Sequence, residues 1–286
     1  GVSKLHGEVS NLMWGKYEGI CKIKSITNAQ EFKYWADHPL YDHMDEGDDD
    51  AFDYRKRHIK KRLFKTVADQ CGKLFDPNVL TIVWARRFAG YKRADLLLHD
   101  KERFYRMLNN PDYPVQIIWA GKPYPMDYSA ISTFNVLVEE SKVNKNVAVL
   151  TGYELALSKL LKQGSDVWLN NPRVPREASG TSGMTAAMNG SVNLSTDDGW
   201  IPEFARHGEN SFVVPKADYA NMSVYEQDNY DLEKLYSILE NEVVPTYYND
   251  RNKWRKIQQT AMNEVKIQFG SDRMADEYYR ELYSGQ

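Results

Sequence analysis

Four basic side chains lie within eight positions directly after the apolar run Val79–Ala85: Arg86, Arg87, Lys92 and Arg93. A guanidinium group binds a phosphate in bidentate fashion, and a lysine adds a point charge. Side chains at the end of a strand are held more rigidly than side chains on a loop. The spacing therefore predicts an anion site. A solvated basic helix start is the alternative that this segment alone leaves open.

A second segment with potential chemistry runs from Asn170 to Asn193 and delivers Glu177 ahead of the sequence SGTSGMTAAMNG. Gly180 and Gly183 allow backbone N–H groups to converge, and the start of the following helix favours an anion. The segment therefore predicts a phosphate cradle, with an ordinary helix cap as the alternative, since it is neither a Walker sequence nor a dinucleotide fingerprint. Hydroxyl groups come from Ser179, Thr181 and Ser182.

Short apolar runs of strand length alternate with longer amphipathic stretches from Asn78 onward. This alternation predicts βα units and a parallel sheet. In open sheets of this kind, ligands bind outside the carboxyl ends of the strands, which is where both motifs lie. The predicted strands are Val79–Ala85, Val115–Gly121, Val147–Gly152, Asp166–Asn170, Ser191–Ser195 and Ser211–Pro215.

The helical patterns between these strands are long enough to form right-handed crossovers, and further helices end the chain. The expected fold class is therefore α/β, a Rossmann-like, doubly wound parallel sheet with C-terminal helices. The predicted helices are Ala94–Leu108, Tyr128–Glu140, Tyr153–Lys162, Leu232–Val244, Arg251–Phe269 and Asp272–Tyr283.

Residues 1–77 have a different pattern, which predicts a helical connector ahead of a Rossmann-like domain over residues 78–286. Helices are expected near Gly7–Gly15 and over Tyr54–Leu74, on either side of the acidic segment Asp42–Asp53. The acidic segment lacks the glycine and glutamate spacing of a calcium loop. Linker or helix-start charges are therefore favoured there over a metal site.

The composition argues against two classes of partner. Lys and Arg total 37 against 40 Asp and Glu, a formal net charge of −3, so no global positive field favours nucleic acid or an anionic membrane. No apolar run reaches the length of a membrane span. The two cysteines, Cys21 and Cys71, form no disulfide framework, and the six histidines lack metal-ligand spacing. A soluble cytoplasmic protein without a metal site is expected.

Several segments together resemble the α-glucan phosphorylases that act on glycogen, starch and maltodextrin, notably their shorter bacterial and archaeal branch. The sequence EASGTSGM followed by AAMNG comes after DVWLNNPR, and ARRFAGYKR and AGK lie upstream. Their order and spacing match that family. The segments LHGEVSNLMW, ITNAQEFKYW and HGENSF fit the same family, so the resemblance covers nearly the whole chain.

The resemblance implies the C-terminal domain of a GT-B glycosyltransferase, whose active site lies between two Rossmann-like domains. In such enzymes, the phosphate group of pyridoxal phosphate exchanges a proton with inorganic phosphate while a terminal glucose leaves as glucose 1-phosphate. By resemblance, Arg87 and Lys92 are the catalytic pair that would hold the substrate phosphate. The glucosyl hydroxyls would be bound by Glu177, Ser179 and Gly180, and the cofactor by Tyr153, Thr181 and Gly183.

The same resemblance implies the partners. An α-glucan and inorganic phosphate would be the substrates, and an N-terminal domain of the same protein would complete the cleft, so the fragment alone is expected to be inactive. Family members are commonly dimers, which leaves a homodimer possible here.

One departure from the family concerns the cofactor anchor. The family has its cofactor-binding lysine after the methionine of this motif, and here Thr185 follows Met184. A threonine hydroxyl cannot form an imine, so covalent attachment of pyridoxal phosphate at this position is not expected. Three interpretations remain open: a phosphorylase that holds the cofactor noncovalently, a glucan synthase-like enzyme that takes glucose from a nucleotide sugar, and a noncatalytic glucan-binding relative.

Overall fold

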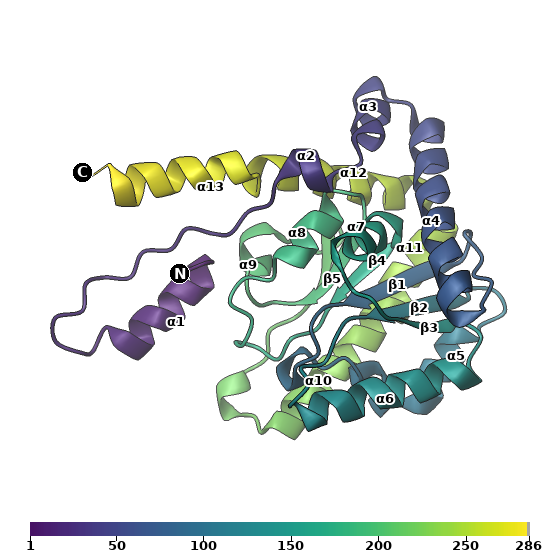
Figure 1. Cartoon of the computed structure of the whole chain (residues 1–286), viewed down its shortest axis with the longest axis horizontal. Helices are drawn as coiled ribbons and strands as arrows, with labels where there is room; N and C mark the ends of the chain where they lie inside the picture. The colour runs from purple at the N-terminus through teal and green to yellow at the C-terminus, as the bar shows by residue number, and fades with distance from the viewer. Residues whose placement is uncertain (285–286) are drawn as a thin grey trace.

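The computed structural model describes residues 1–284 and is built around one parallel sheet (Figure 1). Within the described chain the sheet has six strands in the order β3-β2-β1-β4-β5-β6. The first and fourth strands pair in the middle of the sheet, with Ile82 opposite Val167, so the strand order reverses at this pair. The strands are β1 Leu80–Ala85, β2 Val115–Ala120, β3 Val147–Leu150, β4 Val167–Asn170, β5 Val192–Thr196 and β6 Ser211–Val214.

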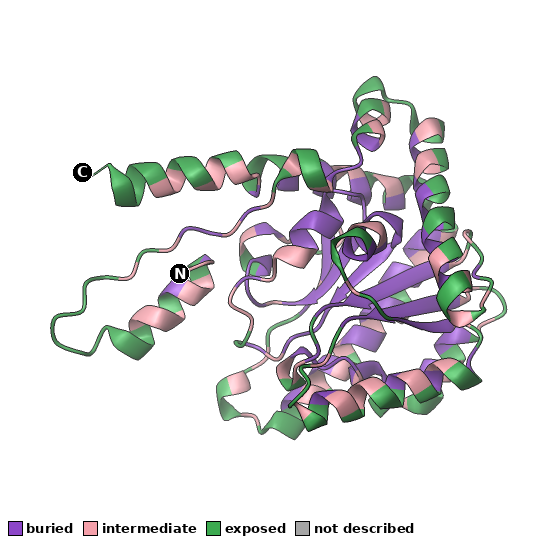
Figure 2. Cartoon of the chain, viewed as in Figure 1, coloured by how far each residue is buried: buried purple, intermediate pink, exposed green. Residues whose placement is uncertain are grey.

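Helices cover both faces of the sheet. Figure 2 shows the strands buried, apart from the half-buried Val213 of β6, while the outer faces of the helices are exposed, which is the expected burial of a parallel sheet. The helices between and after the strands are α5 Lys101–Leu108, α6 Tyr128–Val143, α7 Leu155–Gly164, α8 Thr181–Ala187, α9 Ile201–Phe204, α10 Val224–Ile238, α11 Val244–Asn249, α12 Arg251–Gln268 and α13 Ser271–Tyr278. The predicted doubly wound α/β fold is confirmed.

The first part of the chain is helical and is joined to the sheet. It contains α1 Lys4–Trp14, α2 Phe32–Trp35, α3 His38–Glu46 and α4 Asp49–Cys71. On one face of the sheet, Leu63 and Val67 of α4 share a hydrophobic core with Leu161 of α7 and Ala186 of α8. The other face is covered by α5, α6 and α10–α12. The helix α4 therefore belongs to the packed body, and the domain boundary predicted at residue 77 stays a prediction.

Three predicted helix starts were wrong: α10 begins at Val224 and not at Leu232, because Ser223 and Glu226 form a capping box there, and two others also have identifiable reasons. The helix expected to begin at Ala94 is preceded by a left-handed residue, Arg93 at φ +49°, and α5 begins only after Asp100, whose side chain accepts the Arg103 N–H at 3.0 Å. The helix expected from Tyr54 begins at Asp49, because Asp48 accepts the N–H of Ala51. Short polar residues at such positions satisfy the first free N–H groups of a helix. Part of the acidic segment is therefore a helix start.

The N-terminal segment also borders the edge of the sheet where the predicted motifs lie. The hydroxyl of Ser3, fully buried, donates to the carbonyl of Ala178 at 2.7 Å, and Thr27 donates to Glu203. In Figure 1, α1 and α13 extend from the same side of the sheet. None of the helices within residues 1–284 combines the length and apolar character needed to cross a membrane.

Candidate phosphate-handling site

The two predicted motifs meet at the carboxyl edge of the sheet. Residues 86–93 follow β1, residues 171–180 follow β4, and residues 197–200 follow β5. Because β1 and β4 are neighbours and β4 pairs with β5, all three segments converge on one edge. A reversal of strand order leaves a crevice at such an edge, where open α/β sheets bind their ligands.

Glu177 links the two motifs electrostatically. Its Oε2 atom lies 2.6 Å from Lys92 Nζ and 3.9 Å from the nearest guanidinium nitrogen of Arg86. Both cations are buried, and burial lowers the pKa of the Arg86 guanidinium, an effect that Glu177 partly offsets. Two cations face one carboxylate, so this cluster has an excess positive charge. Such a cluster suits an anionic ligand.

Two buried donors at this site have no partner within residues 1–284. They are Nε of Arg86 and the hydroxyl of Ser179. Buried polar groups are nearly always hydrogen-bonded, so such an atom calls for an explanation. Both atoms belong to the segments that carry Lys92 and Glu177, and a bound oxygen-rich ligand would satisfy them.

The four basic residues after β1 have different environments. Arg86 is buried beside Glu177, whereas Arg87 is exposed. Arg93 is only 4% exposed and donates to the carbonyls of Asn171 and Pro172. It also forms ion pairs at 2.9 and 2.7 Å, with Asp228 and Asp231. The expectation that Arg93 belongs to the anion site was wrong, because its guanidinium is already occupied by acceptors of the fold.

Asp198, which the sequence reasoning missed, lies directly under this site. Its carboxylate accepts the N–H groups of Glu177 and Gly199, both at 2.9 Å. Burial raises the pKa of Asp198 to about 6. The residue follows β5, so the strand-end rule that selected the other motifs could also have found it. Asp198 positions the backbone of Glu177.

Replacement of Asp198 by asparagine is expected to change how stability depends on pH. The native protein binds this proton more tightly than the unfolded chain, whose aspartate has an ordinary pKa of 3.8. The free energy of unfolding should therefore fall as pH rises from about 4 to about 6, by up to about 3 kcal/mol from this group. Asp198→Asn should lose this slope in urea denaturation at several pH values. Parallel curves for the two proteins would contradict the assignment.

The glycine-rich turn needs glycine at two positions, Gly180 for its backbone conformation and Gly183 for close packing. Gly180 has φ +89°, a conformation that favours glycine. A Cβ on Gly183 would lie 2.6 Å from Oδ1 of Asn193, and the Gly183 carbonyl accepts from Nδ2 of the same Asn193 at 3.0 Å. Gly183 thus lets α8 approach β5 closely. Thr181, the first residue of α8, is partly exposed at the site.

Tyr153, after β3, and Thr185, within α8, have different partners. The Tyr153 hydroxyl donates to the carbonyl of Ala85 at the end of β1, and burial raises its pKa. The Thr185 side chain is fully buried and donates to the Ser182 carbonyl at 3.0 Å, within its own helix.

The predicted positions therefore provide only some of the groups that would bind pyridoxal phosphate. The unpartnered donors of Arg86 and Ser179 fit a phosphate-bearing group, and the Tyr153 ring is partly buried. Thr185 does not fit a covalent anchor, because it has no amine. Among the described residues, no cluster of three or more His, Cys, Asp or Glu side chains could hold a metal ion.

Comparison with known proteins agrees with this geometry. Residues 38–238 match the family model described as carbohydrate phosphorylase. An uncharacterised protein of Methanocaldococcus jannaschii is 44% identical over 99% of this chain and 52% of its own length. A maltodextrin phosphorylase of Thermococcus litoralis is 34% identical over 99% of this chain and 39% of its own length. A glycogen phosphorylase of Aquifex aeolicus is 33% identical over 99% of this chain and 47% of its own length. The chain thus spans about half or less of these relatives.

Proposed function

The chain belongs to the carbohydrate phosphorylase family, and on that premise we propose that it is the phosphate-handling domain of an α-glucan phosphorylase. The reaction would be phosphorolysis of an α-1,4-glucan such as glycogen or maltodextrin to glucose 1-phosphate. The observation that carries the proposal is the excess positive charge where Arg86 and Lys92 meet Glu177. A reaction that brings phosphates together needs fixed cations in a cleft that excludes water.

Individual roles follow from position. Lys92 and the exposed Arg87 would hold the substrate phosphate, with Arg86 as an additional buried donor. Glu177, with Ser179 and Gly180, would bind the hydroxyl groups of the glucosyl unit. The unpartnered hydroxyl of Ser179 supports this second role, because it can still donate to a ligand.

Pyridoxal phosphate is the proposed cofactor, and its phosphate would exchange a proton with the substrate phosphate. Tyr153, Thr181 and Gly183 would line its site. The hydrogen bonds that join the Tyr153 hydroxyl to Ser158 and to the end of β1 support a fixed orientation of this ring. These residues would hold and orient the group and exclude water from it.

A partner domain is also proposed. Apolar side chains of α1 and the segment after it are exposed, among them Leu12, Met13 and Trp14. The same segment borders the site through the contact of Ser3 with Ala178. An N-terminal domain that covers these side chains would complete the cleft and bind the glucan. A homodimer remains a possible assembly, and a cytoplasmic location is proposed for the enzyme.

A second candidate function rests on one observation. Thr185 leaves the family's anchor position without an amine, and the same cations could bind the diphosphate of a nucleotide sugar. In that case the protein would transfer glucose to a glucan from a nucleotide donor. A glucan-binding protein without catalysis is the remaining alternative.

One assay on the full-length protein separates these functions. Maltoheptaose and inorganic phosphate are supplied with and without pyridoxal phosphate, and glucose 1-phosphate is measured. ADP-glucose and UDP-glucose are tested in parallel as donors. We expect glucose 1-phosphate only when inorganic phosphate is present. Transfer from a nucleotide sugar without glucose 1-phosphate would favour the second candidate, and glucan binding without either product would overturn both.

A further inference from the structure

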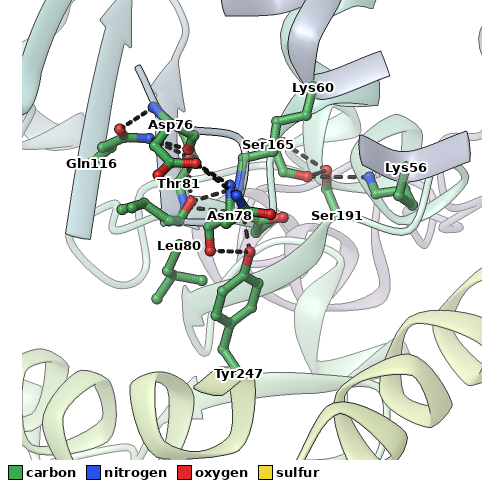
Figure 3. Close-up of polar contacts among 12 residues, drawn as sticks. Lys56, Lys60, Asp76, Asn78, Leu80, Thr81, Gln116, Ser165, Ser191 and Tyr247 are labelled. Carbon is green, nitrogen blue, oxygen red and sulfur yellow. Dashed lines mark hydrogen bonds and ion pairs between the residues drawn. The ribbon is translucent and has the colours of Figure 1, made fainter. Parts of the chain in front are cut away.

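A cavity of about 210 Å³ lies at the amino edge of the sheet, opposite the candidate site. Its walls come from α4, from the residues that precede β1 and β4, and from α11 and α12. Figure 3 shows the side chains of Lys60 and Tyr247 approaching from opposite sides near Asn78. The function proposed above uses none of the residues that line this cavity.

The charged side chains that line the cavity have an excess of cations. Four cations and two carboxylates are present, namely Lys56, Arg57, Lys60 and Arg251 against Asp53 and Asp166. Both carboxylates already have a partner. Asp53 pairs at 2.7 Å with Arg255, which lies outside the lining, and Asp166 pairs with Lys60. The other three cations of the lining are therefore left without a carboxylate of their own.

Lys56 is the buried member of these three cations. The residue is 8% exposed, and its amine donates to three backbone carbonyls at 2.8 to 3.2 Å. Burial, with a smaller contribution from Lys60, lowers the pKa of Lys56 to about 8, although Asp166 opposes the shift. Carbonyl dipoles solvate an ammonium group but do not neutralise it, and buried charges are normally paired. An anion in the cavity would provide the missing partner.

The two arginines of the lining have donors that the fold does not use. Arg57 of α4 and Arg251, the first residue of α12, are exposed and form no ion pair within residues 1–284. The Arg251 guanidinium lies 4.5 Å from the centre of the Tyr247 ring and makes one long hydrogen bond, of 3.4 Å, to the Tyr247 carbonyl. This stacking orients the guanidinium beside the cavity and leaves most of its five N–H donors free.

The size and the charge of the cavity indicate the class of ligand. Pockets that hold drug-sized molecules have volumes of roughly 300 to 1,000 Å³, so about 210 Å³ suits a smaller group. Guanidinium groups bind phosphate oxygens in bidentate fashion, and a lysine adds a point charge. A phosphate group carries close to two negative charges and presents several acceptor oxygens. It can therefore face cations from α4 and α12 at the same time, which a single carboxylate does less well.

We propose that this cavity is a second phosphate site, which binds one phosphate group either as the free ion or as the end of a phosphomonoester. Arg57 and Arg251 bind its oxygens, and the charge of Lys56 attracts it from the buried wall. A bound phosphate links α4 to α12, so it stabilises the folded protein. The inference goes beyond the proposed function, because it requires no phosphorolysis.

The test is phosphate-dependent stabilisation of the full-length protein. Thermal unfolding is followed in a Lys92→Ala background, which impairs the candidate site, with sodium phosphate or with sodium chloride at equal ionic strength. We expect the unfolding temperature to rise with phosphate and to rise much less with chloride. The apparent Kd for phosphate should increase at least tenfold in Arg57→Gln/Arg251→Gln, because two charge-assisted contacts are lost.

A matched control removes the same number of charges elsewhere. Arg62→Gln/Arg106→Gln changes two exposed arginines that do not line the cavity, and its apparent Kd should equal that of the Lys92→Ala parent. Unfolding temperatures without phosphate show whether each variant folds. An equal rise with phosphate and with chloride, or an undiminished rise in Arg57→Gln/Arg251→Gln, would overturn the proposal.

Two further measurements identify the ligand and separate the two sites. Glucose 1-phosphate replaces phosphate in the same background: a rise that depends on Arg57 and Arg251 supports a site for phosphomonoesters, and a rise with inorganic phosphate alone supports a site for the free ion. With Lys92 restored, Arg57→Gln/Arg251→Gln should keep the KM for phosphate in phosphorolysis within about twofold. A larger change would overturn the assignment of a separate site. Absence of phosphorolysis with phosphate stabilisation intact would overturn only the proposed function.

Discussion

Replacement of Lys92 by alanine is expected to lower kcat/KM for phosphorolysis by the full-length protein by roughly 10- to 150-fold. A charge-assisted hydrogen bond contributes roughly 1.5 to 3 kcal/mol, and Lys92 Nζ is placed within 2.6 Å of Glu177 at the centre of the site. The variant would also leave Glu177 with only Arg86, at 3.9 Å, as a nearby cation. The effect should be largest on the KM for phosphate.

The measurement is initial-rate formation of glucose 1-phosphate at varied phosphate and fixed maltoheptaose. Lys142→Ala is a matched control, because Lys142 is an exposed lysine paired only with Glu139 on α6, and exposed pairs of this kind contribute little. Its rates should equal those of the unchanged protein. If the rate of Lys92→Ala depends on phosphate concentration as the rate of the unchanged protein does, Lys92 does not bind the substrate phosphate.

The second large effect is expected on stability. Arg93→Ala should reduce the free energy of unfolding by roughly 3 to 5 kcal/mol, the usual cost of removing one partner from a buried ion pair. The reason is Asp231, which is fully buried and has a pKa raised by burial, an effect that Arg93 opposes. Without Arg93, the Asn171 carbonyl loses its guanidinium donor, and Asp231 loses its cationic partner and keeps the hydrogen bond from the Tyr219 hydroxyl.

Urea denaturation followed by far-ultraviolet circular dichroism measures this loss. Arg106→Ala serves as the control, since Arg106 is an exposed arginine paired with the exposed Glu102 and should change stability by no more than about 0.5 kcal/mol. The double variant with Asp231→Asn should recover part of the loss, because the buried charge is then removed. A loss below about 1 kcal/mol in Arg93→Ala would show that the ion pairs do not hold the segments after β1 and β4 together.

Much of the architecture could be predicted from local pattern. The alternation of apolar runs and amphipathic stretches places all six strands within one or two residues of their observed bounds. The position of Glu177 and of the basic residues at strand ends also follows from the chain, because parallel strands bring their carboxyl ends to one edge. Helix starts were less accurate where capping by Asp48 or Asp100 decides the first residue.

The tertiary structure was needed to assign different roles to neighbouring residues of the same type. Arg86, Arg87 and Arg93 are chemically alike in the sequence, and only their burial and partners separate a site cation, an exposed cation and a structural one. Asp198 was missed for a related reason, because burial between segments far apart in the chain is what raises its pKa.

The sequence by itself determined the α/β fold and the edge of the sheet that carries the site. It also showed that residue 185, a threonine, has no amine. Each of these depends on local periodicity or on the identity of one residue. Only the tertiary structure decided which cations face Glu177, which arginine is part of the core, and which buried donors lack a partner among the described residues. Those properties depend on distances and dielectric environment between segments far apart in the chain, which spacing along the sequence does not specify.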